Sequence, residues 1–237
     1  MQFNHFKQKV GDDVPEWRPR KPPVRQTLRG RFCTLSPLDV MKHGKALYEA
    51  YSLTPDDRDW TYLFSDKPTN RVSFANNLNV MAHSDDPLYF AVIDNATRKA
   101  AGTVAFVRIE PVYGVQEIGS VIWSPLLRRR AAGTEAIYLM LAHTFDTLGY
   151  RRCEWRCDSL NEASKTAAVR FGFTYEGTFR QAVVYKGRNR DTDWFAIIDS
   201  EWPALRRAYR WWLSPDNFDR HGKQIRPLRD FMIARSA

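Results

Sequence analysis

The sequence predicts a mixed α/β fold, in which a central mixed β-sheet is flanked by helices. Segments with strand character alternate with segments of helical periodicity in the second half of the 237 residues, an order that calls for right-handed crossovers on one sheet. Hydrophobic residues make up 43% and aromatic residues 14% of the chain, which indicates a packed globular protein. No internal repeat or low-complexity linker divides the chain, so one domain with extensions is the economical prediction.

Both ends of the chain differ from its centre. Residues 1–27 are polar and contain several prolines, which favours an N-terminal arm. Residues 28–202 contain most of the expected strands and helices and form the predicted domain. Residues 203–237 are expected to form a C-terminal helical and basic extension packed on that domain.

The first elements are a strand and two helices. Residues 31–35 form the first strand candidate. Ser36 followed by Pro37 is a favourable helix start, because serine caps the first turn and proline fits just inside it. That helix extends to about Tyr51, and a second helix is predicted over 74–81.

Three strands and a longer helix follow. Apolar residues recur at helical spacing from Thr134 to Leu148, and Gly149 is placed as the C-cap of this helix. The strands are expected at 89–94, 101–109 and 116–123, with a turn at 95–97.

The next strand, 152–157, carries two of the three cysteines. Strand alternation puts Cys153 and Cys157 on one face with Trp155. Four residues of extended chain separate these thiols by roughly 13 Å, too far for a disulfide. Together with Cys33 they form neither a disulfide framework nor a zinc pattern, so buried thiols are expected.

The remaining elements alternate again between helix and strand. Gly172 marks the end of a helix over 162–171. Further elements are strands near 173–187 and 193–199, a charged turn over 186–194, and a helix over 202–212 before the basic tail.

The segment from Glu117 to Ala136 reads as a strand, a short basic loop with small residues, and a helix. The first turn of a helix offers unpaired N–H groups and the positive end of the helix dipole, a combination that binds a pyrophosphate. The arginines Arg128, Arg129 and Arg130 add charge-assisted hydrogen bonds. Neither a P-loop lysine nor the glycine pattern of a dinucleotide fold is present. Taken alone, an ordinary turn before an amphipathic helix explains this segment equally well.

Three segments in order carry a family resemblance. Arg128, Ala131 and Gly133 occupy the positions of a Gln/Arg-x-x-Gly-x-Gly/Ala motif, with alanine replacing the first glycine. Asn161-Glu-Ala-Ser164 and the segment 172–177 follow downstream. Together they resemble the GCN5-related N-acetyltransferases, and their spacing resembles the RimJ/RimL-like branch.

This resemblance runs from about Arg31 to Trp202 and implies that residues 28–202 are an N-acetyltransferase domain. The implied fold has three layers, and two adjacent parallel strands splay apart to admit the cofactor. The implied co-substrate is acetyl-CoA, with no metal. Its pantetheine and thioester would contact Val121, Ile122 and Trp123, its pyrophosphate Arg128, Arg129, Arg130, Ala131, Ala132, Gly133 and Thr134, and its thiol end Asn161 and Ser164.

The resemblance also implies the proton acceptor. Related enzymes place a general base near the start of the strand that holds Glu117, acting directly or through water. Strand alternation puts Glu117 on one face with Gly119, Val121 and Trp123. The alternative is a glutamate at a strand end that is only solvated or ion-paired.

On the thiol side, many family members carry a tyrosine seven residues after the asparagine, but Ala168 stands there. Ser164 matches the serine that RimJ/RimL-like members place near the CoA sulfur. Its alternative role is to satisfy the backbone at the start of its own helix. The glutamate that ribosomal-protein acetyltransferases carry in the strand after Gly-Phe is absent, because 180–185 contains no carboxylate.

Two segments are candidates for binding the acceptor. Trp60 and Tyr62 lie between the early helices, where exposed aromatics stack on a substrate, although burial in the core is the simpler interpretation. Arg188 and Arg190 lie in the charged turn and either bind a carboxylate or phosphate on the acceptor or pair with Asp191 and Asp193.

The implied activity is direct acetyl transfer in a ternary complex to a primary amine, which is a small metabolite, an aminoacyl compound or a protein N-terminus. A covalent cysteine route is disfavoured, because no Cys–His pairing is visible. The alternative is a catalytically silent CoA-binding or nucleic-acid-associated module on the same fold. The net charge of +9 does not by itself favour nucleic acid, since the arginines are scattered and no nucleic-acid motif accompanies them.

Location and assembly are inferred from composition. No apolar run reaches membrane-spanning length and the N-terminus lacks the apolar core of a signal peptide, so cytoplasmic residence and no membrane partner are expected. The tryptophan-rich segment 202–212 either caps the core or forms a homodimer contact.

Overall fold

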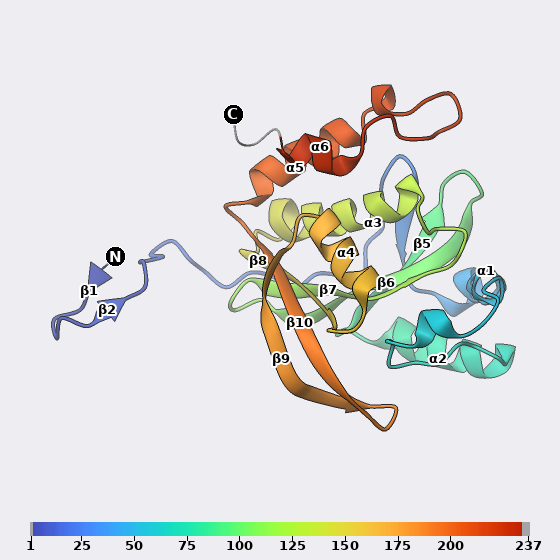
Figure 1. The fold of residues 1–237 in the computed structure, drawn as a ribbon, viewed down its shortest axis with the longest axis horizontal. Helices are drawn as coiled ribbons and strands as arrows, with labels where there is room; N and C mark the ends of the chain where they lie inside the picture. The colour runs from blue at the N-terminus through green and yellow to red at the C-terminus, as the bar shows by residue number, and fades with distance from the viewer. Residues whose placement is uncertain (1, 234–237) are drawn as a thin grey trace.

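A computed structural model describes residues 2–233 of the chain and centres on an eight-stranded sheet (Figure 1). The strand order is β3-β4-β5-β6-β7-β8-β10-β9. β7 and β8 are parallel and every other neighbouring pair is antiparallel, which confirms the predicted mixed sheet. The strands are β3 (Leu28–Arg29), β4 (Cys33–Pro37), β5 (Leu88–Asp94), β6 (Lys99–Glu110), β7 (Val115–Trp123), β8 (Arg152–Asp158), β9 (Thr174–Tyr185) and β10 (Arg188–Ile198).

Helices cover both faces of the sheet, so the molecule is layered (Figure 1). Two separate clusters of buried apolar side chains hold these layers together, one on each face. On one face lie α1 (Val40–Ser52), the short helix η1 (Arg58–Trp60) and α2 (Arg71–His83). On the other lie α3 (Ala131–Ala142), η2 (His143–Thr147), α4 (Glu162–Arg170) and α5 (Trp202–Trp212), followed by η3 (Pro215–Asn217) and α6 (Leu228–Ile233).

The N-terminal segment contains a two-stranded hairpin, β1 (Gln2–Phe3) with β2 (Lys9–Val10), that projects away from the sheet (Figure 1). The hairpin lay outside the sequence prediction. Further along, the segment docks on the body: the Trp17 indole N–H donates to the Val112 carbonyl at 3.0 Å, and the Tyr150 hydroxyl donates to the Lys21 carbonyl at 3.2 Å.

The predicted start of the first helix at Ser36 is wrong. Pro37 is the last residue of β4, and the N-cap is Asp39, whose carboxylate accepts the backbone N–H of Lys42 at 3.0 Å. The chain stays extended through this point because the Leu38 N–H donates to the Tyr89 carbonyl of β5. The residue that caps the helix is therefore Asp39 and not Ser36.

The predicted start of the third helix is three residues late. Arg130 is the N-cap in an extended conformation, so Ala131, Ala132 and Gly133 already form the first helical turn. Gly149 follows the last turn with φ +64°, as expected of a C-cap position, and Gly172 follows α4 with φ +94°.

The predicted charged turn over 186–194 is also wrong. β9 and β10 form a hairpin joined by Lys186 and Gly187 alone, and β10 begins at Arg188. Both connecting residues have left-handed backbones, with φ 48° and 70°, which is the geometry of a two-residue hairpin turn. The charges that suggested a turn lie on β10, where Arg188 is exposed and Arg190 and Asp193 are buried.

The strand β8 carries its cysteines as predicted. Cys153, Trp155 and Cys157 are buried in the same apolar cluster, and the thiols are free. Burial raises the pKa of Cys157 to about 11, so this thiol is protonated at neutral pH.

A carboxylate of α3 holds the chain that enters β4. Glu135 is 3% exposed and accepts the backbone N–H groups of Arg31, Phe32 and Cys33 at 2.8, 2.6 and 2.8 Å. These donors precede or begin β4, so a single side chain ties the edge of the sheet to the helix that starts at the basic loop. No helix among residues 2–233 has the length and apolar character needed to cross a membrane.

Candidate active site

The parallel strands β7 and β8 pair only at their starts. Val115–Glu117 pairs with Arg152–Glu154, and beyond Glu117 the two strands diverge. This is the splay that the family resemblance implied. A cleft of about 1950 Å³ opens there and extends along the starts of α3 and α4 to the segment between α1 and α2.

Most of the residues predicted for the site line this one cleft. The exceptions are Ala132, which is 4% exposed and packs in the core, and Arg188, an exposed residue of β10. The predicted residues that line it are Trp60, Tyr62, Glu117, Val121, Ile122, Trp123, Arg128, Arg129, Arg130, Ala131, Gly133, Thr134, Asn161, Ser164 and Arg190.

One end of the cleft is built to hold an anion. The first turn of α3 presents N–H groups without intrahelical partners and the positive end of the helix dipole. Gly133 keeps this turn close to the loop, because a Cβ there would lie 3.3 Å from the Leu127 carbonyl oxygen and 3.4 Å from the Trp123 Nε1. Arg129 and Arg130 are exposed beside it. These residues fit the pyrophosphate of CoA.

The third arginine of the loop is already engaged. Arg128 forms an ion pair with Asp59, and its Nε donates to the Trp123 carbonyl at 3.2 Å. It therefore joins η1 to the loop, unlike Arg129 and Arg130. Sequence reasoning missed Arg170, which also lines the cleft and donates to the Thr134 hydroxyl at 2.9 Å. No local pattern marks it, because the contact depends on how α4 packs beside α3.

Ser164 stands in the first turn of α4. Its backbone N–H donates to the Asn161 side chain at 3.1 Å, which caps the helix, so Asn161 has a structural role here. The Ser164 hydroxyl oxygen accepts the indole N–H of Trp155 at 3.0 Å. That bond leaves the hydroxyl proton available for donation into the cleft. Trp155, from β8, was not among the predicted site residues.

The predicted facing of β7 is partly wrong. A bulge interrupts the strand at Ser120, whose φ is 50°, so the register to β6 shifts between Gly119 and Ile122. Glu117 and Gly119 therefore share the α1–α2 face with Ile122, and Trp123 points to the opposite face. A bulge adds one residue to one strand, which inverts the alternation beyond it.

Glu117 is 6% exposed and held by two cations. Its Oε2 accepts Nε of Arg108 at 3.0 Å and Nε of Arg156 at 2.6 Å. Burial raises the pKa of the Glu117 carboxyl, and the two guanidinium groups, Arg156 first, oppose that shift. The two arginines thus hold the Glu117 carboxylate in one orientation, while its burial disfavours the ionised form.

The two arginines belong to a larger ion-pair network. Arg108 also pairs with Glu154, and Arg152 donates to Glu154 at 2.7 Å. The guanidinium groups of Arg108 and Arg156 lie 4.7 and 4.8 Å from the ring centre of Trp194. This network positions Glu117 through contacts on both neighbouring strands.

At the other end, the hairpin β9–β10 is tied to the segment after η1. Lys186 donates to the carbonyls of Trp60 and Ser65 at 3.0 and 3.1 Å and pairs with Asp66 at 2.8 Å. The Trp60 side chain is 3% exposed and packs edge-on against Tyr51, so it is chiefly a core residue.

The expected pairing among the charges near the hairpin turn is wrong. Asp191 accepts the Gln181 N–H at 2.7 Å and the Asn189 amide at 3.0 Å, and Asp193 accepts the Thr178 hydroxyl at 2.5 Å. Within residues 2–233, no group of three or more His, Cys, Asp or Glu side chains is arranged to hold a metal ion.

Comparisons with known proteins agree with this geometry. A model of the acetyltransferase (GNAT) domain matches residues 34–174. The crystal structure of a GCN5-related N-acetyltransferase from Brucella melitensis is 50% identical, with a TM-score of 0.91, and the match covers 93% of this chain and 100% of that one. The ribosomal L7/L12 α-N-protein acetyltransferase RimL is 20% identical with a TM-score of 0.61, over 73% and 94% of the two chains, which shows a shared fold.

A curated relative is the uncharacterized N-acetyltransferase YoaA of Bacillus subtilis, 29% identical over 102 residues. The match covers 43% of this chain and spans 57% of that relative's length. The domain match extends over more than half of the sequence, and the Brucella relative is similar along nearly all of it. The chain therefore belongs to the GCN5-related N-acetyltransferase (GNAT) family.

Proposed function

We propose that this protein transfers an acetyl group from acetyl-CoA to a primary amine, directly and in a ternary complex. The observation that carries the proposal is one continuous cleft that joins the anion-binding start of α3 to the Glu117 carboxylate and the Ser164 hydroxyl. Acetyl-CoA supplies the acetyl group as a thioester, and the protein binds, orients and moves protons. Holding both reactants in one cleft lowers the entropic part of the barrier.

Binding of CoA is assigned to the protein backbone and to two arginines. The first-turn N–H groups of α3, with Arg129 and Arg130, hold the pyrophosphate. Beyond Glu117, β7 is free of β8, so residues 121–123 can offer backbone groups to the amides of pantetheine.

Glu117 is assigned as proton acceptor, directly or through a water. Both arginine bonds engage Oε2, which leaves Oε1 as the oxygen that takes the proton. The raised pKa of this carboxyl brings its basicity closer to that needed near neutral pH.

Ser164 is assigned as proton donor or hydrogen-bond partner of the departing thiol. Its hydroxyl accepts from Trp155, so its own hydrogen points elsewhere, and the residue lines the cleft.

The finer assignments stand as further proposals: the RimJ/RimL-like branch, cytoplasmic residence, and an acceptor that is a small metabolite, an aminoacyl compound or a protein N-terminus. A homodimer is proposed through α5. This helix caps the core with Trp202 and Trp212 buried, and Trp211 is 55% exposed on its outer side.

The test is a titration with acetyl-CoA, CoA and duplex DNA, followed by release of free CoA across a panel of amines. Saturable acetyl-CoA binding with amine-dependent release is expected. Saturable binding without turnover of any amine favours the catalytically silent module. Salt-sensitive DNA binding with no CoA affinity contradicts the proposal.

A further inference from the structure

A buried arginine lines the end of the cleft formed by the hairpin β9–β10 and the segment after η1, which we call the acceptor end. Arg190 of β10 is 8% exposed. Its guanidinium carbon lies 5.0 Å from the ring centre of Phe64 and 5.6 Å from that of Tyr185. Two aromatic faces therefore hold the planar group in place from the loop and the hairpin.

Arg190 differs from the other cations of this region in its partners. Arg128 pairs with Asp59, Arg156 with Glu117, and Lys186 with Asp66. For Arg190, the structure of residues 2–233 places no carboxylate oxygen within 4.0 Å. The nearby carboxylate of Asp158 is instead occupied by the Tyr185 hydroxyl at 2.7 Å.

The hydrogen-bonding capacity of this guanidinium is largely unused. An arginine has five N–H donors, and here only Nε has a partner in the described chain, the Thr192 hydroxyl at 3.3 Å. A buried cation without a counter-ion is unfavourable, and aromatic contacts compensate only in part. An oxyanion in the cleft would satisfy the terminal donors with a bidentate pair.

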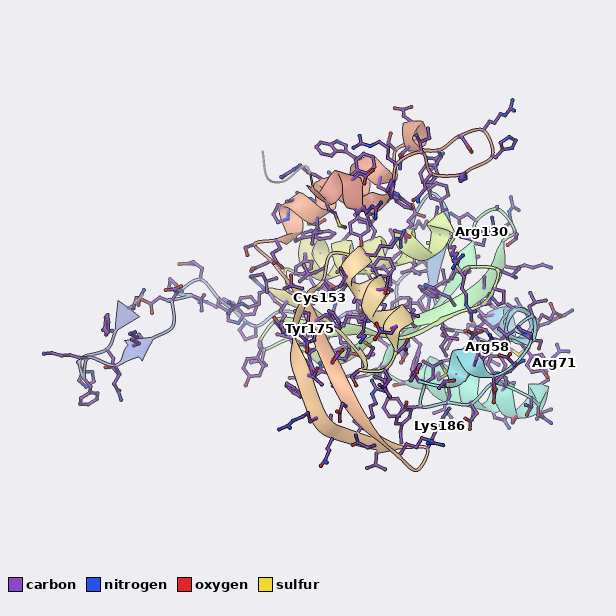
Figure 2. All side chains as sticks on the ribbon, viewed as in Figure 1. Arg58, Arg71, Arg130, Cys153, Tyr175 and Lys186 are labelled. Atoms are coloured by element: carbon purple, nitrogen blue, oxygen red, sulfur yellow. The ribbon has the colours of Figure 1, made fainter. Side chains whose placement is uncertain are left out.

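Arg190 contacts Phe64, Tyr185 and Thr192, so we treat its anion as separate from the pyrophosphate at the start of α3. Figure 2 shows Arg130 beside that helix start and Lys186, next to the strand of Arg190, at the tip of the hairpin, well apart. Phe64, which lies against Arg190, comes from the segment after η1, and Tyr62 of the same segment also lines the cleft.

We infer that the amine acceptor carries a carboxylate or phosphate group and that Arg190 binds it. This inference rests on the proposed acetyl transfer and names the class of its acceptor. The two terminal nitrogens of the Arg190 guanidinium bind the anionic group and so orient the acceptor. The amine at the opposite end of the acceptor then lies toward Glu117.

Matched pairs of acceptors test the inference. Each pair shares an amine and differs in the anion: amino acids against their amides, and O-phosphoethanolamine against ethanolamine. The measured quantity is the ratio of kcat/KM for the anionic and neutral members in wild type and in Arg190→Gln. Comparing this ratio between variants cancels the different basicity of the two amines.

Arg190→Gln should lower the ratio at least about tenfold, chiefly by raising KM for the anionic member, because a charge-assisted pair is lost. Arg190→Lys should give an intermediate ratio, since it keeps the charge and loses the fork. Arg180→Gln, an exposed arginine on the adjacent strand, should keep the wild-type ratio. The Kd for acetyl-CoA and the Tm should stay near wild type in all three.

Equal effects of Arg190→Gln on both members of each pair, or none, overturn the inference. A second readout needs no turnover: with CoA saturating, increasing inorganic phosphate should raise the Tm of wild type more than that of Arg190→Gln. If no amine is acetylated but this difference is seen, the acetyl transfer fails and the anion site stands. If amines are acetylated without any effect of Arg190, the anion site fails and the transfer stands.

Discussion

The indole nitrogen of Trp155 donates to the hydroxyl oxygen of Ser164 over 3.0 Å, linking the middle of β8 to the first turn of α4. A serine hydroxyl can accept and donate at once, and this bond occupies one of its two acceptor lone pairs. For the proposed role of Ser164, Trp155 would therefore be a positioning residue. The packing of Trp155 against Phe171 and Phe173, with ring centres 5.9 and 5.8 Å away, fixes the indole in turn.

Ser164→Ala should lower kcat by roughly 100-fold, the low end of the usual range for a general acid, while changing the Kd for acetyl-CoA little. Single-turnover rates and binding titrations separate these effects. Ser159→Ala, from the preceding turn outside the cleft, is the matched control. Unchanged turnover in Ser164→Ala removes this serine from the chemistry.

Glu117→Gln should lower kcat/KM by about 100-fold and remove the acid limb of its pH profile. The base works in its ionised form, and burial raises its pKa. Wild-type activity should therefore rise with pH through a limb above the usual glutamate range. Glu154→Gln disturbs the same Arg108 from outside the cleft and should retain the limb. If the acid limb persists in Glu117→Gln, another residue is the base.

Arg130→Ala should weaken acetyl-CoA binding by roughly 10- to 100-fold, or about 1.5–3 kcal/mol, because a charge-assisted bond to the pyrophosphate is lost. Its kcat at saturating acetyl-CoA should change little. Isothermal titration gives the Kd. Arg71→Ala removes an exposed arginine outside the cleft and controls for net charge. Equal Kd values for the two variants contradict this placement of the pyrophosphate.

Glu135→Ala should destabilise the fold by roughly 3–5 kcal/mol, because three backbone donors, one of them the buried Cys33 N–H, lose their shared buried acceptor together. Urea denaturation followed by tryptophan fluorescence measures this change. Glu49→Ala, at an exposed site of α1, should stay within about 0.5 kcal/mol of wild type. A loss below about 1 kcal/mol would show that water satisfies these donors in the variant.

Most helices and strands were predictable because each has a local sequence pattern that indicates it. The apolar stripe before Gly149 marks α3, and alternation across Cys153, Trp155 and Cys157 marks β8. The basic loop was visible as well, since small residues and arginines at a helix start need no long-range contact to be noticed. Its helix began earlier than predicted because Ala131 and Gly133 fit a first helical turn as well as a loop.

The predictions that were wrong concern features that depend on contacts with residues distant in the sequence. The bulge at Ser120 shows only in the register between β6 and β7, and sequence alternation cannot reveal an inserted residue. The strand β9 was predicted, but the first residues of β10 were mistaken for a turn because their side chains are charged or polar, although Arg190 and Thr192 are buried. Trp155 and Arg170 were missed because each contacts a residue of a different element, Ser164 of α4 and Thr134 of α3, and no local sequence pattern predicts such a contact.

The early divergence of β7 from β8 has a kinetic consequence. Past Glu117, one edge of β7 has no strand beside it in the described residues, and pantetheine at its proposed site would complete the sheet there. Acetyl-CoA would then form part of the wall against which the amine rests. On this proposal we expect a compulsory order, with the thioester entering first and free CoA leaving last.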